Sequence, residues 1–121
     1  NLIEKDEYLK CISSISEVKK NIFKTNYPKK KFKFIVGDVK ETLKKKIPQK
    51  ISLLRLDTDW YESTKKELNV LFPKLSKGGV LIIDDYKTWG GCKKAVDEYF
   101  KNKKNVFFIS IDNEALLGIK F

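Results

Sequence analysis

The apolar positions of the chain form two kinds of pattern, short continuous runs and stretches with helical spacing. The runs ISLLRLD at 51–57 and VLIIDD at 80–85 predict strands that are covered on both sheet faces. FKFIVGD predicts an earlier strand at 32–38, and the last two strands are expected at 106–111 and 115–121.

Helical spacing predicts four helices, which alternate with these strands. The first begins with a capping box formed by Ser14 and Glu17, and the Pro28 that follows it favours its end. The expected helices are 15–26, 39–46, 62–75 and 90–102.

The order of these elements predicts an α/β fold. Strands that alternate with helices are typical of βαβ units, and therefore of a mostly parallel sheet. The turn at Asp112 and Asn113 is too short for a crossover, so the last two strands should form an antiparallel hairpin. No internal repeat, low-complexity tract or linker interrupts the sequence, and residues 1–121 are predicted to form a single domain.

Composition narrows the location and class of the protein. The chain is 41% hydrophobic, but no apolar run approaches the ~20 residues that would span a bilayer. The first ten residues are charged and lack the apolar segment of a signal peptide. Because no apolar run is long enough, no membrane association is expected. Cys11 and Cys92 do not make a disulfide framework, so a reducing, cytoplasmic location is expected.

The net charge of +10 comes almost entirely from lysine, because Arg55 is the only arginine. Readout of base edges favours the planar arginine fork, so specific nucleic-acid binding is not expected. The lysine runs at 29–31 and 44–46 lie beside turns, where a solvated surface is the usual explanation. Weak, salt-sensitive binding to polyanions stays open.

The absence of histidine excludes several kinds of active site. Neither a Ser–His nor a Cys–His nucleophilic pair can form, and zinc sites that need imidazole are also excluded. Two cysteines cannot complete a four-thiolate zinc site. Any chemistry must therefore use carboxylates, lysines, tyrosines or a bound cofactor.

Acidic residues follow three of the predicted strands, at the edge of an α/β sheet where ligands bind. They are Asp38, Asp57, Asp59, Asp84 and Asp85. Carboxylates that meet there repel one another unless a cation or hydrogen-bond donors compensate. Oxygen ligands suit Mg²⁺, Ca²⁺ or Mn²⁺ and do not suit zinc.

Two alternatives to a metal site stay open. Asp59 is placed to cap the helix at 62–75, and Asp85 to order the loop before residue 90, although capping explains only one acidic residue at each junction. Arg55 leaves its strand on the same face as Asp57, so we predict that it pairs with a carboxylate of the sheet edge or of a neighbouring helix. An ordinary interior ion pair without a catalytic role is the other interpretation.

Two long motifs carry a family resemblance. LLRLDTDWYEST at 53–64 and LFPKLSKGGVLIIDDYKTWGGCKKAVDEYF at 71–100 resemble the macrocin O-methyltransferase family, and the order of elements matches from about residue 10. The resemblance implies a Rossmann-like, S-adenosylmethionine-dependent enzyme that methylates sugar hydroxyls in antibiotic biosynthesis with a divalent metal such as Mg²⁺.

The resemblance also implies roles for particular residues. Asp57 would be a metal ligand and the base near the acceptor hydroxyl, with Asp84 and Asp85 completing the metal site. The cofactor would contact Gly37, Asp38, Val39 and Thr58, and the acceptor pocket would include Trp60 and Tyr61.

The family's domain begins with a strand and a glycine-rich loop, then a second strand, and nothing before residue 32 resembles either. The chain is therefore expected to be the C-terminal part of such a domain, lacking its first two strands. Their absence would separate the strands at 32–37 and 51–57 by roughly three spacings of ~4.8 Å. An isolated chain must then rearrange, pair with another copy as a homo-oligomer, or expose unpaired strand edges.

Three functions follow from these observations. The preferred one is a metal-assisted O-methyltransferase, or a fragment of one, acting on a small-molecule hydroxyl. The second is a non-catalytic, truncated α/β module that binds a partner or a polyanion through its lysine-rich surface. The third, a generic nucleotide-binding domain, is disfavoured because no phosphate-binding loop is present.

Overall fold

The structure, a computed structural model, describes residues 13–45 and 47–121. The chain divides into two compact units, Asn1–Val36 and Gly37–Phe121, which we describe separately, and the single-domain assignment of 1–121 stays a prediction. Cys11 lies outside the described residues. Within the described part, no helix has both the length and the apolar character needed to cross a membrane.

The first unit contains helix α2, Ile15–Phe23, and the short 3₁₀ helix η1, Lys29–Lys31. The predicted capping box is present, because the Ser14 hydroxyl accepts from Glu17 N and the Glu17 carboxylate accepts from Ser14 N. Helix α2 ends three residues earlier than predicted, just before the C-cap residue Lys24. Phe32, beyond η1, packs its ring against Phe23.

The strand predicted at 32–38 is wrong, since none is assigned to this segment in the described residues. A strand is stabilised by ladder hydrogen bonds to a neighbouring strand. All four strands of the described sheet belong to the second unit, where they pair only with one another.

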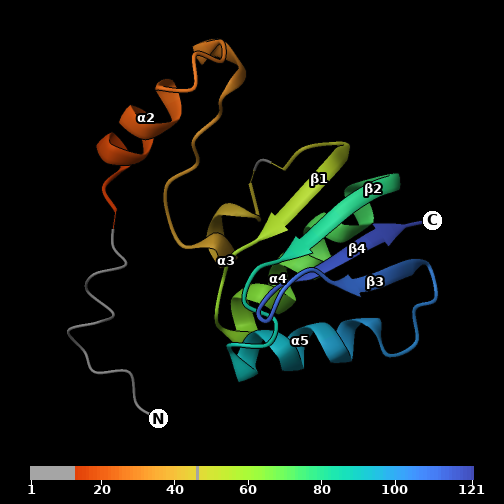
Figure 1. Cartoon of the computed structure of the whole chain (residues 1–121). Helices are drawn as coiled ribbons and strands as arrows, with labels where there is room; N and C mark the ends of the chain where they lie inside the picture. The colour runs from red at the N-terminus through yellow and green to blue at the C-terminus, as the bar shows by residue number, and fades with distance from the viewer. Residues whose placement is uncertain (1–12, 46) are drawn as a thin grey trace. The chain divides into compact units, whose positions relative to one another are not determined.

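The second unit is built on a four-stranded sheet of order β1-β2-β4-β3 (Figure 1). Strands β1 and β2 are parallel, whereas β4 is antiparallel to both β2 and β3. The α/β class and the C-terminal hairpin are confirmed, but the sheet is mixed rather than mostly parallel. The strands are β1, Ile51–Leu56; β2, Leu75–Ile83; β3, Val106–Ser110; and β4, Leu116–Lys120.

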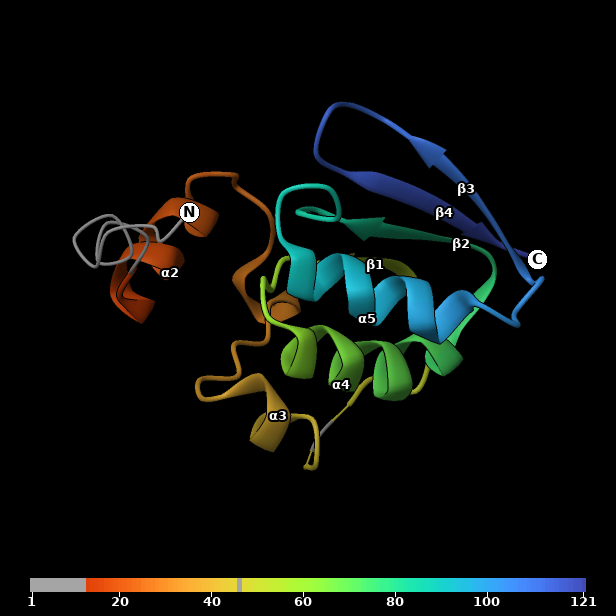
Figure 2. The same ribbon diagram turned by 90° about the horizontal axis from the view of Figure 1, so that it is seen from below.

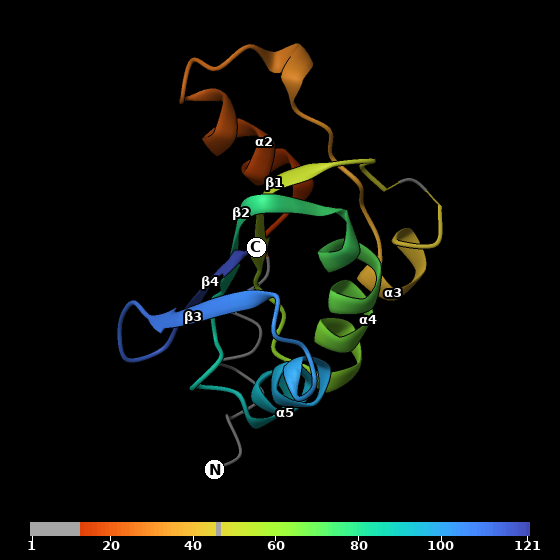
Figure 3. The same cartoon turned by 90° about the vertical axis from the view of Figure 1, so that its right-hand side faces the viewer.

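Helices α4, Tyr61–Leu71, and α5, Gly90–Phe100, lie side by side on one face of this sheet (Figure 2). The short helix α3, Val39–Thr42, lies next to α4 (Figure 3). The sequence predicted all three helices, each with more residues than the structure shows. The end of the helix expected at 62–75 is instead a 3₁₀ turn, η2, Phe72–Lys74, because Pro73 cannot continue an α-helical hydrogen-bond ladder.

The core lies between the sheet and these two helices. Inward-facing residues of β1 and β2 meet apolar residues of α4 and α5 there, including Leu54, Leu56, Leu81, Ile83, Leu68, Phe72, Cys92 and Val96. Burial of this apolar surface is the main contribution to the stability of the second unit.

The opposite face of the sheet is also apolar, but it is exposed. Leu53, Val80, Ile119 and Phe107 align across all four strands, and the side chains of Leu53 and Phe107 are each 60% exposed. The expectation that both faces of the first two strands are covered is therefore wrong in the second unit, whose long helices both lie on one side.

Candidate functional site

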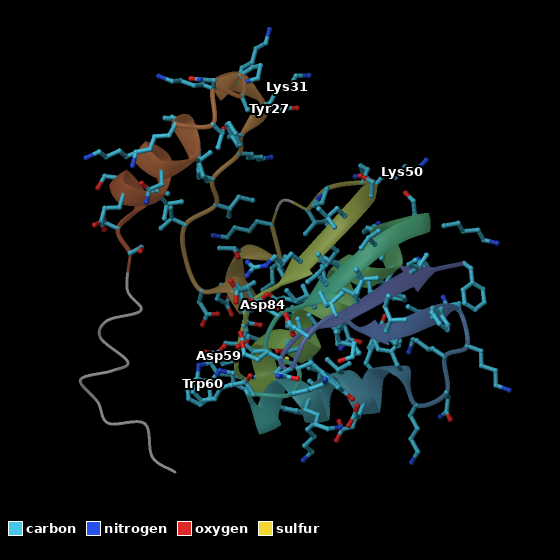
Figure 4. All side chains as sticks on the ribbon, viewed as in Figure 1. Tyr27, Lys31, Lys50, Asp59, Trp60 and Asp84 are labelled. Atoms are coloured by element: carbon cyan, nitrogen blue, oxygen red, sulfur yellow. The ribbon has the colours of Figure 1, made fainter. Side chains whose placement is uncertain are left out.

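Parallel pairing brings the ends of β1 and β2 together. Leu56 is paired with Ile83, and Asp84 N donates to Leu56 O at 3.0 Å, so Asp57 and Asp84 leave the sheet side by side. Figure 4 shows Asp59, Asp84 and Trp60 at this same end of the sheet.

Three carboxylates converge at this edge. Asp57, Asp84 and Asp85 each present an oxygen that lies within 4.8 Å of the other two. Ca²⁺–oxygen distances of 2.3–2.6 Å allow ligands up to ~5 Å apart, whereas Mg²⁺ would need the oxygens to close to within ~4.2 Å. The residues thus fit a hard divalent cation, with a small closing movement for Mg²⁺.

Arg55 bridges two of these carboxylates. Its guanidinium donates to Asp57 at 2.8 Å and to Asp84 at 2.7 Å, which confirms the predicted pairing with the sheet edge. The Arg55 side chain is 51% exposed, so this is not an interior ion pair. One guanidinium faces four carboxylates, since Asp59 and Asp85 also lie here, and the site keeps an excess of negative charge.

Burial and this charge excess both raise the pKa of the two remaining acids, Asp85 and Asp59. Burial raises the pKa of Asp85, and repulsion from Asp59, Asp84 and Asp57 raises it further. Burial and the neighbouring Asp57 likewise raise the pKa of Asp59. A bound cation would relieve this repulsion.

The capping alternative does not account for these two acids. The N-cap residue of α4 is Trp60 and that of α5 is Trp89, and neither helix start has a side-chain cap. Asp85 does order the following loop, but through its backbone carbonyl, which accepts from Thr88 N and Trp89 N. The Asp85 carboxylate instead belongs to the cluster with Asp57 and Asp84 at the sheet edge.

A cavity of about 470 Å³ adjoins the acidic cluster, a size typical of small-molecule sites. Its lining includes five of the residues predicted for cofactor, metal or substrate, together with four others. The predicted ones are Asp38, Val39, Asp57, Thr58 and Trp60, and the others are Lys40, Asp59, Glu62 and Ser63.

Gly37 and Tyr61 are predicted site residues that are not part of this lining. Gly37 precedes Asp38 and has a φ of 135°, a conformation that favours glycine. The Tyr61 hydroxyl donates to Glu98 at 2.6 Å, which links α4 to α5. Their proposed roles stay predictions.

A buried polar network lies next to the loop after β1. It includes Glu67, which the sequence analysis did not identify as a site residue. The Thr58 hydroxyl donates to Glu67 at 2.7 Å, and the Thr64 hydroxyl donates to Thr58 O at 2.9 Å. Glu67 is only 7% exposed, and burial raises its pKa against the opposing effect of the Thr58 hydrogen bond. Its position next to Leu68, on the buried face of α4, was the available signal.

Gly91 is a second residue that the sequence analysis missed. A Cβ atom there would lie 2.9 Å from Tyr61 N and 3.2 Å from Asp59 O. The first turn of α5 therefore packs directly against the backbone that carries Asp59 and Trp60, and only glycine permits this approach.

Comparison with known families gives one clear match. The family model described as Macrocin-O-methyltransferase (TylF) matches residues 2–117. The chain belongs to this family.

Individual TylF-family relatives agree with this match. The demethyldecarbamoylnovobiocin O-methyltransferase of Streptomyces niveus is 41% identical over 86 residues, which is 71% of this chain and 33% of that protein. The 8-demethyl-8-(2,3-dimethoxy-alpha-L-rhamnosyl)-tetracenomycin-C 4'-O-methyltransferase of Streptomyces olivaceus is 43% identical over 67 residues, 55% of this chain and 25% of that protein.

A solved structure, that of the O-methyltransferase NovP, superimposes with a TM-score of 0.81 at 36% identity. The match covers 88% of this chain and 45% of NovP. The fold is therefore that of the Rossmann-like methyltransferases. The chain spans less than half the length of each of these three relatives.

Proposed function

We propose that this TylF-family chain acts in S-adenosylmethionine-dependent methylation of a sugar hydroxyl on a small-molecule glycoside, with a bound divalent cation. The observation that carries the proposal is the convergence of Asp57, Asp84 and Asp85 beside a cavity lined by the family's own motif. One relative is named for methylation of a rhamnosyl compound, which supports a sugar acceptor.

The residues at the sheet edge would hold the two groups that the reaction needs. Asp57, Asp84 and Asp85 would bind the cation, which lowers the pKa of a coordinated hydroxyl when it is present. Asp38, Val39 and Thr58, together with Gly37, would contact S-adenosylmethionine, whose sulfonium methyl is already activated.

The chain's own contribution is orientation and proton transfer. Arg55 holds Asp57 and Asp84 in fixed positions, which favours alignment of the acceptor oxygen with the methyl group. Asp57 would accept the hydroxyl proton. Asp59 is the second candidate for this role because it borders the same cavity, whereas Asp57 is already paired with Arg55.

Location and assembly belong to the proposal as well. The buried Cys92 is a free thiol in the structure, in keeping with a reducing cytoplasm. The exposed apolar sheet face supports self-association into a homo-oligomer.

The test combines ligand binding with methyl transfer. Calorimetry should show that Mg²⁺ or Ca²⁺ and S-adenosylmethionine bind, and that Asp57→Asn, Asp84→Asn and Asp85→Asn each weaken cation binding at least tenfold. Asp97→Asn is the matched control, because Asp97 is an exposed carboxylate on α5 that pairs with Lys93.

Two results would contradict the proposal. One is the absence of heat with either ligand. The other is unchanged binding in Asp57→Asn together with steeply salt-dependent binding to a polyanion such as heparin, which would favour the non-catalytic module.

A further inference from the structure

The buried polar side chains in the described part of the chain all lie on one face of α4. They are Ser63, Thr64 and Glu67. Residues three or four positions apart share one face of a helix. All three side chains form hydrogen bonds to the loop between β1 and α4, which carries Asp57 and Asp59. This buried polar face of α4 therefore serves the loop beside the candidate site.

The three hydrogen bonds hold the loop at two residues. The Ser63 hydroxyl donates to Trp60 O at 2.9 Å, and the Thr64 hydroxyl donates to Thr58 O at 2.9 Å. The Glu67 carboxylate accepts from the Thr58 hydroxyl at 2.7 Å. Helix α4 thus holds Thr58 by its backbone and by its side chain at the same time.

The buried carboxylate of Glu67 needs a reason that the two hydroxyls do not. Serine and threonine near a helix start commonly bond to the local backbone. A buried carboxylate, in contrast, costs free energy unless a cation pairs with it. Among the described residues Glu67 has no such cation, and the charge that acts on it is the repelling one of Asp57. Its hydrogen bond with Thr58 is the contact that a carboxylate provides here.

Thr58 occupies the position from which both neighbouring acids can be oriented. It lies between Asp57, a member of the carboxylate cluster, and Asp59, and all three residues line the cavity. The backbone has only two soft dihedrals per residue, so holding Thr58 at both ends restricts the directions in which the flanking carboxylates leave the chain. Hydrogen bonds from residues behind the ligands orient a metal site and raise its affinity.

We propose that Glu67 is a positioning residue of the cation site, which acts through Thr58 to hold the carboxylates of Asp57 and Asp59 in place. The inference rests on the proposed function, since it assumes that a divalent cation binds at the carboxylate cluster. It adds a residue that lies outside the cavity lining and to which the family resemblance gave no role.

Tb³⁺ is a suitable probe, because it is a hard cation with oxygen ligands and its luminescence is sensitised by a nearby tryptophan such as Trp60. Its affinity is measured by titration of the whole chain. Glu67→Ala should weaken Tb³⁺ binding about tenfold, and Thr58→Val, which removes the hydroxyl but no charge, should do the same. The double variant should bind no more weakly than either single variant, because both changes remove one contact.

Glu67→Gln separates position from charge. Its amide oxygen can still accept from the Thr58 hydroxyl, whereas the negative charge is gone. We expect this variant to retain most of the wild-type affinity for Tb³⁺. A loss as large as that of Glu67→Ala would overturn the inference, because the charge and not the position would then matter. Additive losses in the double variant, or an unchanged affinity in Thr58→Val, would overturn it as well.

Leu68→Ala is the control for a general loss of stability. Leu68 is a fully buried apolar residue next to Glu67 on the same helix. Its truncation should lower the melting temperature at least as much as Glu67→Ala does and leave Tb³⁺ affinity unchanged. An equal loss of affinity in Leu68→Ala would show that binding merely follows stability, and the inference would be wrong.

Hydrogen–deuterium exchange over residues 58–64 tests the inference without a metal. This segment contains the amide of Thr64, which donates to Trp60 O at the start of α4. Exchange should be faster in Glu67→Ala and Thr58→Val than in wild type, and unchanged in Glu67→Gln. If wild type binds no Tb³⁺ but this pattern appears, the proposed function fails and the positioning role stands. If wild type binds Tb³⁺ but neither variant changes exchange or affinity, the positioning role fails and the proposed function stands.

Discussion

At the scale of single residues, the main feature of the candidate site is its excess of negative charge. Asp57 and Asp84 share the guanidinium of Arg55, while Asp85 is repelled by four neighbouring acids. Arginine suits this position because its planar fork reaches two carboxylates at once. The guanidinium keeps the acids close together in the absence of a metal, and so it prepares the arrangement that a divalent cation would need.

Replacing Arg55 should therefore make the protein depend on the cation. In Arg55→Gln, Asp57 and Asp84 lose their shared counter-charge, so the melting temperature in EDTA should fall below that of the wild type. Ca²⁺ should then raise the melting temperature of the variant by more than that of the wild type, as differential scanning fluorimetry can measure. An equal rise in both proteins would show that the cation does not bind beside Arg55.

Glu67 should make stability depend on pH. Its pKa in the folded protein is raised, so the protonated form stabilises the fold at low pH, and this contribution is lost as the pH rises through the raised pKa. Glu67→Gln removes the ionisation and keeps an acceptor for Thr58. The free energy of unfolding of the variant, relative to wild type, should increase from pH 4 to pH 7 in urea titrations.

The control for this experiment is Glu41→Gln, because Glu41 is exposed on α3 and pairs with Lys44 at the surface. Its free energy of unfolding should follow that of the wild type across the pH range. A flat difference for Glu67→Gln as well would mean that the hydrogen bond from Thr58 offsets the effect of burial in the folded protein.

At the scale of elements, the site depends on how closely α5 approaches the start of α4. The parallel pairing of β1 with β2 brings Asp57 and Asp84 side by side. The contact of Gly91 with the backbone of Asp59 and Tyr61 fixes the loop between β1 and α4. Both helices have a tryptophan as their N-cap residue and pack on the same sheet face. Displacing one helix start must therefore move the side chains of the other.

Two adjacent glycines test this contact with a matched pair of variants. Gly91→Ala should destabilise the fold by about 1–3 kcal/mol, because the new methyl group overlaps backbone atoms, and it should weaken cation binding by moving Asp59 and its neighbours. Gly90→Ala places its methyl group in open space and should change stability by less than about 0.5 kcal/mol. Equal effects of the two substitutions in chemical denaturation would refute the close contact.

At the scale of the whole molecule, the second unit has two apolar sheet faces and helices over only one of them. The exposed face includes Leu53, Phe107, Ile109 and Ile119, each at least 41% exposed. Strand β1 also forms an edge of the described sheet. Exposed apolar surface beside an edge strand favours association, and a second copy of the chain offers a surface of the same kind.

A charge placed on this face should reduce self-association. Phe107→Lys introduces an ammonium group at the β3 end of the aligned row, on the exposed face. Sedimentation velocity at micromolar concentration should therefore show smaller amounts of dimer and of higher oligomers than for the wild type. Asn102→Lys adds the same charge at an exposed site beyond α5 and is the control. A wild type that stays monomeric at all concentrations would exclude association through this face.

The sequence alone determined the local elements and the identity of the acids. Apolar runs and helical spacing placed β1, α4, α5 and the final hairpin, because these patterns reflect local preferences and burial of one face. The same motifs indicated the family, and the position of the acids after apolar strands indicated a site at the sheet edge. Pairing of Arg55 with that edge also followed from the two-residue period of a strand.

Other features depended on contacts between segments that are distant in the chain. The strand at 32–38 was wrong because a strand exists only with a partner, and its own residues do not reveal whether one is present. The burial of Glu67, the close approach of Gly91 to the backbone before α4, and the contact between the Trp60 and Trp89 rings each join segments that only packing brings together. Local sequence sets which side chains are available, whereas the tertiary structure sets the distances between them. The charge balance of the candidate site and its fit to a cation depend on those distances.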